Sequence, residues 1–159
     1  MPSVLFVCTG NQYRSPLAAA AFRKRLEQDG SAGAWSVASA GTWTPSGLPP
    51  LPDALRVARG LGLDLSRHRT TALDADLLSR ADVILVMTRA HKESILSEFP
   101  AARGKVHLLS EAAGDAAYEI ADPAAPDVDL AQVARQVYEL IERGYPAICM
   151  LAKQDFRNA

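Results

Sequence analysis

The fold of this chain is decided by residues 4–16, which read VLFVCTGNQYRSP. The run begins with apolar residues prone to β structure, a pattern typical of a short strand buried on both faces of a parallel sheet. Ser15 and Pro16 suit the cap and the first turn of a helix, and Gly30 suits the end of that helix. The stretch therefore predicts a buried strand, a tight loop and a helix.

Strands and helices continue to alternate along the rest of the sequence. We expect strands at residues 35–40, 83–87 and 106–109, and helices at residues 17–28, 52–61, 73–80, 90–99 and 128–143. Gly144 and Pro146 are expected to end the last of these helices. Alternation of this kind predicts a parallel sheet with helices on both faces, and such sheets bind ligands at the carboxyl ends of their strands. The loop that starts at Cys8 is therefore the expected site.

The composition favours a single soluble domain over residues 1–159. Hydrophobic residues make up 48% of the chain, which is enough to bury a core without disulfides or a bound metal. Charged residues interrupt every apolar stretch before it reaches the roughly 20 residues that a membrane span needs, so we expect no membrane association. The 17 basic and 18 acidic residues nearly cancel, which argues against a nucleic-acid partner.

Cysteine and histidine are sparse. Cys8 and Cys149 are too few for a disulfide framework or a four-thiolate metal site, and with no secretory leader in the sequence we expect a cytoplasmic location. His68, His91 and His107 lack the spacing of metal ligands, and we interpret each as a packing or surface residue. No metal and no cofactor are therefore expected.

The loop after the first strand has the residues to bind one phosphate group. Gly10 and Asn11 tolerate left-handed backbone, so the loop can curl until its N–H groups and the helix N-terminus converge on one anion. The expected phosphate-binding residues are Thr9, Gly10, Asn11, Gln12, Tyr13, Arg14 and Ser15.

A thiol at the base of this loop is a candidate nucleophile. The loop dipoles and the guanidinium of Arg14 favour the thiolate form of Cys8, which can attack phosphorus. Arg14 can hold two phosphoryl oxygens, and Ser15 can donate to the sulfur when it leaves. A merely buried, apolar Cys8 is the alternative, but it does not explain why a strand, a flexible turn, an arginine and a helix start coincide.

The motif at residues 7–16, VCTGNQYRSP, resembles the signature Val-Cys-x-Gly-Asn-x-x-Arg-Ser-Pro of the low-molecular-weight protein tyrosine phosphatase family. The likeness spans about residues 3–143 through SAGT at 39–42, ADVILVM at 81–87, KVHLLS at 105–110 and Asp122-Pro123. The resemblance implies a flavodoxin-like three-layer α/β sandwich with a four-stranded parallel sheet, and metal-independent hydrolysis of phosphomonoesters through a phosphocysteine. Residues 145–159 depart from the family and are expected to form an atypical C-terminal tail.

The resemblance also implies roles for two further positions. Asp122 matches the residue that protonates the leaving oxygen and then activates water; its alternative is an ordinary Asp-Pro turn. Asn11 matches a residue of left-handed backbone that a serine, here Ser39, helps to hold in place. Cys8, Arg14 and Asp122 are thus the candidate catalytic residues.

The chain departs from the family pattern around the substrate mouth. Tyr13 stands where most members have a second cysteine, so a protective disulfide within the loop is impossible. Ala124 follows Asp122-Pro123 where an aromatic wall is usual. We expect Gln12, Tyr13 and Trp43 to form the mouth.

These features lead to one main hypothesis and three alternatives. The main hypothesis is hydrolysis of protein phosphotyrosine, with inorganic phosphate or other oxyanions as inhibitors and a monomer or weak homodimer as the assembly. A protein-arginine phosphatase differs only at the mouth, whereas an arsenate reductase needs further cysteines that residues 88–100 lack. A noncatalytic phosphoprotein-binding module needs neither the thiol of Cys8 nor the acid of Asp122.

Overall fold

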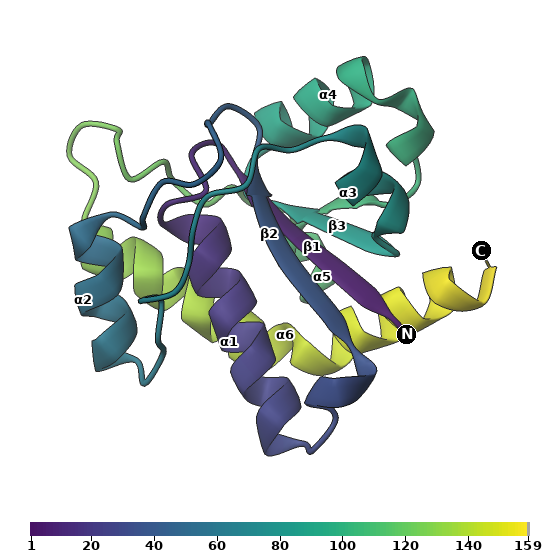
Figure 1. Ribbon diagram of the computed structural model, residues 1–159, viewed down its shortest axis with the longest axis horizontal. Helices are drawn as coiled ribbons and strands as arrows, with labels where there is room; N and C mark the ends of the chain where they lie inside the picture. Colours follow the sequence, from purple (N-terminus) through teal and green to yellow (C-terminus); the bar gives the residue numbers. More distant parts are fainter. Residues whose placement is uncertain (159) are drawn as a thin grey trace.

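Four parallel strands form the centre of the molecule in the computed structural model, which describes residues 1–158 (Figure 1). They are β1 (Ser3–Cys8), β2 (Ser36–Gly41), β3 (Val83–Val86) and β4 (Val106–Leu108), in the order β2-β1-β3-β4. The central strand β1 pairs with β2 and β3, so that Cys8 lies opposite Gly41 and Val7 lies opposite Val86. This sheet confirms the predicted fold class and places Cys8 at its carboxyl edge.

Helices cover both faces of the sheet. The face that carries Phe6 and Leu85 shares its core with α1 (Arg14–Gln28), α2 (Pro52–Gly60), α5 (Leu109–Ala112) and α6 (Leu130–Asn158). The face that carries Leu5 and Ile84 packs with α3 (Ala75–Arg80), α4 (Arg89–Glu98) and the 3-10 turn η2 (Pro100–Ala102). The other 3-10 turn, η1 (Ala32–Ala34), leads into β2. Successive β1 residues point to opposite faces, so one apolar run is buried by both helical layers.

Aromatic side chains fix α1 and α6 against the sheet. Phe22 of α1 lies with its ring centroid 5.8 Å from that of Phe6 and 5.2 Å from that of Tyr145. Phe22 is fully buried, and burying a side chain of this size contributes roughly 2–3 kcal/mol. The first strand, the first helix and the last helix thus share one core.

The predicted end of the last helix at residue 143 is wrong, because α6 runs on through Pro146 to Asn158. Proline has no N–H for the carbonyl four residues earlier, which here belongs to Glu142. Arg25 of α1 compensates, because its Nη1 donates to the Glu142 carbonyl at 3.2 Å and to the Glu142 carboxylate at 3.1 Å. A side chain from a neighbouring helix therefore replaces the missing backbone donor.

Gly144 is a close-packing residue of α6 and does not end the helix. A Cβ atom at this position would lie 2.3 Å from the Cβ of Ala113, where α5 ends. Residues 145–158 continue the helix and bury Tyr145, Ile148 and Ala152 in the core, while residue 159 lies outside the described residues.

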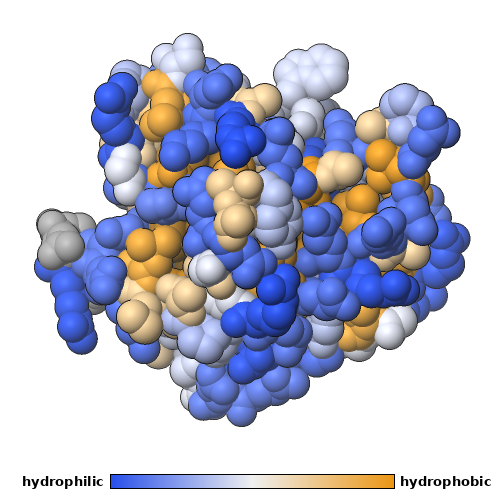
Figure 2. Space-filling view, turned by 180° about the vertical axis from the view of Figure 1, so that it is seen from behind, coloured by the Kyte–Doolittle hydropathy of each residue, from blue (hydrophilic) through white to orange (hydrophobic). Residues whose placement is uncertain are grey.

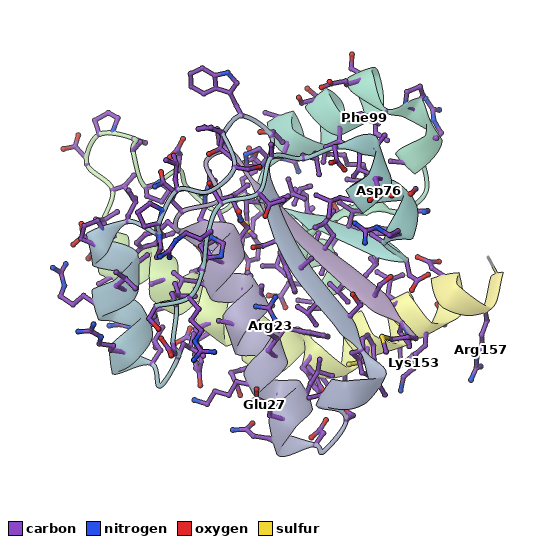
Figure 3. The ribbon with its side chains drawn as sticks, viewed as in Figure 1. Arg23, Glu27, Asp76, Phe99, Lys153 and Arg157 are labelled. Carbon is purple, nitrogen blue, oxygen red and sulfur yellow. The ribbon has the colours of Figure 1, made fainter. Side chains whose placement is uncertain are left out.

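The outer edge of β2 is covered by the side chain of Arg23 and by the backbone of residues 71–73. Figure 3 shows Arg23 on α1 near β2, where its Nη2 donates to the carbonyl of Val37 at 2.7 Å. Further along β2, Gly41 donates its N–H to the Thr71 carbonyl and accepts from the N–H of Leu73, both at 2.9 Å. At the opposite edge, β4 is only three residues long.

Hydrophilic residues cover most of the face seen in Figure 2, and hydrophobic residues form small separate patches there. Of the helices within residues 1–158, none combines the length and the apolar character needed to cross a membrane.

Candidate active site

Residues 8–13 form a loop between β1 and α1 at the carboxyl edge of the sheet. Asn11 has φ 54°, the left-handed conformation expected for it, and α1 begins at Arg14 rather than at residue 17. The loop is deeply set: Cys8 is 3% exposed, Arg14 is 2% exposed, and Asn11 and Ser15 are fully buried. This buried loop thus joins Cys8, at the end of β1, to the N-terminus of α1.

Asn11 holds the loop in shape through both its side chain and its carbonyl. The side-chain Nδ2 donates to the hydroxyls of Ser15 at 2.8 Å and Ser39 at 3.0 Å, and Oδ1 accepts from the N–H of Thr71 at 2.9 Å. The Asn11 carbonyl accepts from Nε2 of His68 at 2.7 Å. The contact with Ser39 is the one that the resemblance implies, whereas the contact with His68 was not predicted.

The end of β2 supports the loop from the side. A Cβ atom on Gly41 would lie 2.6 Å from the Thr9 carbonyl, so only glycine permits this approach. The next two residues bind the loop backbone: the N–H of Thr42 donates to the Cys8 carbonyl at 2.9 Å, and that of Trp43 donates to the Thr9 carbonyl at 3.1 Å.

The nucleophile candidate has a hydroxyl beside it. The sulfur of Cys8 lies 3.0 Å from Oγ of Ser15, which itself accepts from Asn11. The proton of the Ser15 hydroxyl therefore remains available to the sulfur, since the other acceptor in reach, the Ala40 carbonyl, is more distant at 3.5 Å. A hydroxyl that donates to sulfur stabilises a thiolate.

The guanidinium of Arg14 is buried and only partly bonded. Its Nη1 donates to the carbonyl of Ile120 at 2.9 Å, and its buried Nε has no hydrogen-bond partner within the part of the chain that the structure describes. Ile120 is fixed in turn, because its N–H donates to the carbonyl of Met87 at the end of β3, at 2.9 Å. A buried cation with unused donors is suited to bind an anion.

Asp122 lies two residues after Ile120, whose carbonyl accepts from Arg14. It is exposed, and its Oδ1 accepts from the N–H of Ala124 at 2.9 Å in a turn. Burial lowers the pKa of His91, the charge of Arg14 lowers it further, and the charge of Asp122 opposes both effects.

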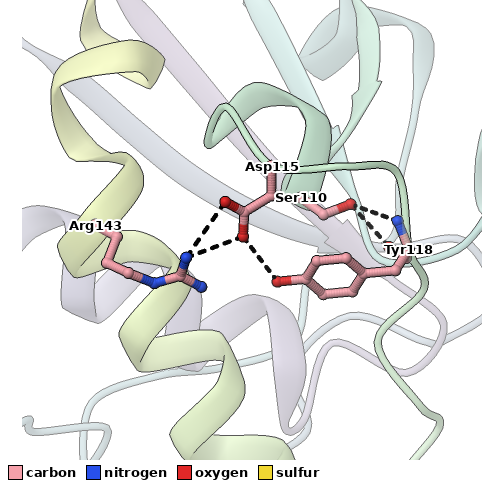
Figure 4. Close-up of polar contacts among 4 residues, drawn as sticks. All are labelled: Ser110, Asp115, Tyr118 and Arg143. Carbon is pink, nitrogen blue, oxygen red and sulfur yellow. Dashed lines mark hydrogen bonds and ion pairs between the residues drawn. The ribbon is translucent and has the colours of Figure 1, made fainter.

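Polar contacts anchor the loop that carries Asp122 (Figure 4). The hydroxyl of Ser110 donates to the Tyr118 carbonyl at 2.8 Å and accepts from the Tyr118 N–H at 3.0 Å. Asp115 accepts from the Tyr118 hydroxyl at 3.2 Å and pairs with Arg143 of α6 at 3.1 Å. The segment that leads to Asp122 is thus tied to α5 and α6.

The three residues predicted to form the mouth differ in their exposure. Gln12 is held at the rim by a bond from its Nε2 to the Pro49 carbonyl, at 2.8 Å, and Trp43 is 85% exposed. The prediction for Tyr13 is wrong, because its ring is 3% exposed and its hydroxyl donates to the carbonyl of Leu130 at the start of α6. Burial is the main cause that raises the pKa of Tyr13 to about 12, with Asp53 adding to it. Tyr13 therefore links the loop to α6.

His91 is a residue of the site that sequence reasoning missed. It is 6% exposed, its Nε2 lies 2.8 Å from Oγ1 of Thr9, and its Nδ1 accepts from the N–H of Thr88 at 3.2 Å. Burial and, next, the charge of Arg14 lower its pKa to about 4, so the ring is neutral near pH 7. The spacing Thr88-x-x-His91 is a capping pattern, the one signal in the sequence that pointed to this position.

Within residues 1–158 no group of three or more His, Cys, Asp or Glu side chains is arranged to hold a metal ion.

Comparison with known proteins agrees with this geometry. The sequence profile described as "Low molecular weight phosphotyrosine protein phosphatase" matches residues 3–157. The chain belongs to this family. The match includes most of the segment 145–159, which the sequence motifs had left outside the likeness.

Two curated relatives of this phosphatase differ in their stated substrates. It is 40% identical, over 91% of its length and 92% of the relative, to a probable low molecular weight protein-tyrosine-phosphatase, EpsP, from Ralstonia nicotianae. It is also 32% identical to the protein-arginine-phosphatase of Bacillus subtilis, over 95% of each chain.

A solved structure with the same fold is that of an arginine phosphatase. It is a cysteine-to-serine mutant of the YwlE arginine phosphatase with a phosphorylated active-site serine, 31% identical to this phosphatase. The TM-score is 0.81, and the match covers 96% of this chain and 94% of the other.

Proposed function

We propose that this protein hydrolyses phosphotyrosine in proteins through a phosphocysteine formed on Cys8. In the first step the thiolate of Cys8 attacks phosphorus, the bond from phosphorus to the leaving oxygen breaks, and Asp122 gives that oxygen its proton. In the second step the carboxylate of Asp122 takes a proton from water, the water oxygen attacks phosphorus, and the S–P bond breaks. The hydroxyl of Ser15 donates to the sulfur as it leaves, and inorganic phosphate is released.

The observation that carries this proposal is the contact between Cys8 and Ser15 together with the buried, partly bonded Arg14. The sulfur has a hydroxyl 3.0 Å away, and the guanidinium has a buried Nε donor without a partner within residues 1–158. An oxyanion held there would meet the thiolate and would neutralise the buried Arg14, which is the electrostatic stabilisation that phosphoryl transfer requires.

The experiment that tests the chemistry uses purified, reduced protein and p-nitrophenyl phosphate at mildly acidic pH. Cys8→Ser is expected to abolish turnover while inorganic phosphate still binds, as measured by calorimetry. If the unmodified protein binds phosphate but gives no turnover, it is a phosphate-binding module and the enzymatic proposal fails.

Asp122→Ala tests the acid. Loss of a proton donor is expected to slow aryl phosphates with poor leaving groups by roughly a hundredfold and those with good leaving groups much less. Asp127→Asn is the matched control, because it removes a charge from the same loop and asparagine tolerates the positive φ of 60° there. Equal losses for good and poor leaving groups would count against Asp122 as the acid.

Hydrolysis of phosphoarginine in proteins is the second candidate function, and the residues at the rim of the site favour it. Ala124 follows Pro123 where the family resemblance implies an aromatic wall, and Gln12 is bonded to the Pro49 carbonyl. Trp43 remains as an exposed aromatic group near the loop. We therefore propose that Trp43 and Gln12 contact the substrate side chain.

A comparison of kcat/KM for phosphotyrosine, phosphoarginine and phosphoserine peptides decides between the two substrates. We expect phosphotyrosine to be preferred, and we expect Trp43→Ala to raise KM for the phosphotyrosine peptide without a matching fall in kcat. A preference for phosphoarginine would reverse the substrate assignment and leave the mechanism intact.

The proposal also includes a cytoplasmic location, which both free cysteines support.

A further inference from the structure

His91 is buried beside the phosphate loop, yet the mechanism above does not use it. The residue belongs to the first turn of α4, on the sheet face opposite to α1. It reaches the loop through a single contact, from Nε2 to Oγ1 of Thr9 at 2.8 Å. Thr9 directly follows the nucleophile, so this contact joins α4 to the residue next to Cys8.

The hydrogen bonds on the two ring nitrogens fix the tautomer. A backbone N–H can only donate, so Nδ1, which lies 3.2 Å from the N–H of Thr88, must be the acceptor. The proton of a neutral ring is then on Nε2, and Nε2 donates to the hydroxyl oxygen of Thr9. The Thr9 hydroxyl accepts in this bond, so its own proton is not used there, and that proton has no acceptor among residues 1–158.

The backbone of Thr9 is held from the other side as well. Its carbonyl accepts from the N–H of Trp43 at 3.1 Å, while its side chain is held by His91. The charged groups that face His91 are Arg14 from α1, and Asp122 and Glu119 from the loop before α6. A neutral imidazole can thus orient the Thr9 hydroxyl without placing a second buried cation next to Arg14.

We propose that His91 is a positioning residue which, by donating to Oγ1 of Thr9, aims the Thr9 hydroxyl proton at the oxyanion in the loop. The inference rests on the proposed function, because it assigns one more donor to the same phosphate site. Thr9 would contact the anion, and His91 acts only through Thr9. The donor is set before the substrate binds, which is how a preorganised site lowers a barrier.

Two substitutions of His91 separate this role from helix capping. The Oδ1 atom of asparagine can replace Nδ1 and keep the bond from Thr88, but asparagine is too short to reach Thr9. The Nε2 atom of glutamine can replace the ring Nε2 and reach Thr9, and glutamine is also a usual acceptor for the N–H of the capping residue at this position. Asparagine therefore keeps only the contact with Thr88, whereas glutamine can keep the contact with Thr9.

If His91 positions Thr9, His91→Asn lowers kcat/KM for p-nitrophenyl phosphate about tenfold, which is the effect of losing one hydrogen bond to a charged group. His91→Gln then keeps most of the kcat/KM of the unmodified protein. If His91 only caps α4, both variants keep the cap and have equal kcat/KM. Equal values of kcat/KM in the two variants would overturn the proposal. Thermal unfolding of both variants shows whether each one folds.

A second pair of variants tests whether the effect passes through Thr9. Thr9→Val removes the hydroxyl with little change in shape, and Thr9→Ser keeps it as the conservative control. In the double variant Thr9→Val with His91→Asn, we expect kcat/KM no lower than in Thr9→Val alone, because the same donor is already lost. Losses that multiply in the double variant would show that His91 acts by another route.

A binding measurement keeps the inference separate from the catalytic proposal. In the Cys8→Ser background, which is not meant to turn over, calorimetry with inorganic phosphate should give a Kd about tenfold higher for His91→Asn and nearly unchanged for His91→Gln. An unchanged Kd in both variants would contradict the inference even if the enzyme is active. Conversely, this pattern can appear in a protein that only binds phosphate.

Discussion

Asn11 shows how a single residue can hold a binding loop in one conformation. A non-glycine residue in left-handed backbone costs roughly 1 kcal/mol or more. Here the cost is offset by bonds to Ser15 within the loop, to Ser39 on β2, and to His68 and Thr71 on the segment beyond α2. Because these partners come from separate parts of the chain, the loop is set by folding rather than by the arriving anion.

At the same scale, His91 makes the stability of the protein depend on pH. Its pKa falls from 6.5 to about 4 in the folded state, because of burial and then Arg14, against the smaller effects of Asp122 and Glu119. Between these values the unfolded chain binds more protons than the folded one, so the free energy of unfolding decreases as pH falls. The decrease from this group amounts to at most about 3 kcal/mol.

Urea denaturation at pH 7 and at pH 4.5 measures this effect. The free energy of unfolding of the unmodified protein should fall more steeply between these pH values than that of His91→Asn, which has no group to titrate at this position. His68 and His107 have pKa values lowered mainly by burial, so both contribute a slope of the same sign in both proteins. Identical slopes would show that His91 is not the group responsible.

Tyr13 determines how Cys8 responds to oxidation. A sulfenic acid on Cys8 needs a second thiol to form a disulfide, and Tyr13 occupies the place where the loop of most family members supplies one. Cys149 is half-buried on α6, where burial raises the pKa of its thiol. We expect Cys149→Ser to leave both the rate of inactivation by hydrogen peroxide and the recovery with dithiothreitol unchanged. A disulfide between Cys8 and Cys149 in the mass spectrum would contradict this.

At the scale of elements, α6 shows how one helix can pass a proline without breaking. The free carbonyl of Glu142 is satisfied by Arg25, whose guanidinium also lies 4.7 Å from the ring centroid of Tyr145. The continuous helix lets one element hold Arg143 near the acid loop and bury Ile148 in the core further along.

The double variant of Arg25 and Pro146 tests this compensation. Arg25→Met keeps the apolar stem and is expected to lower the free energy of unfolding by about 1–2 kcal/mol, since it leaves the Glu142 carbonyl without a donor. In the background of Pro146→Ala the backbone N–H is restored, so the same change should cost clearly less. Urea denaturation of the four proteins gives both costs. Equal costs in the two backgrounds would mean that Arg25 acts only through its ion pair and its ring contact.

At the scale of the whole molecule, the proposed phosphate site consists of segments from across the chain. Cys8 and Arg14 come from the start, Ser39 from β2, His91 from α4, and Ile120 from the loop before α6. An anion that binds this constellation binds the folded chain and not the unfolded one.

Phosphate is therefore expected to stabilise the protein as a whole. At a phosphate concentration of 100 times Kd, the free energy of unfolding should rise by about 2.7 kcal/mol. Thermal or urea unfolding with and without phosphate, at constant ionic strength with chloride, measures the change. Arg14→Ala is the control and should gain little. The same gain in that variant would place the bound phosphate somewhere other than the loop.

The sequence predicted those features that neighbouring residues specify. The run 4–7, the glycine and asparagine of the loop and the Ser-Pro start of α1 act within a few positions of each other, so strand, loop and helix followed from local rules. The roles of His68 and His91 did not follow from local rules, because their hydrogen-bond partners lie 57 and 82 residues away in the sequence. Pro146 was misleading for the same reason, since the donor that rescues the helix belongs to α1.

The covered edge of β2 limits how this protein can recognise another chain. Arg23 occupies the carbonyl of Val37, and residues 71–73 use the backbone of Gly41, so a peptide cannot extend the sheet there as an added strand. On the other side, the short β4 offers little length for such pairing. A substrate protein is therefore expected to bind without adding a strand to the sheet, through contacts with side chains rather than through backbone pairing.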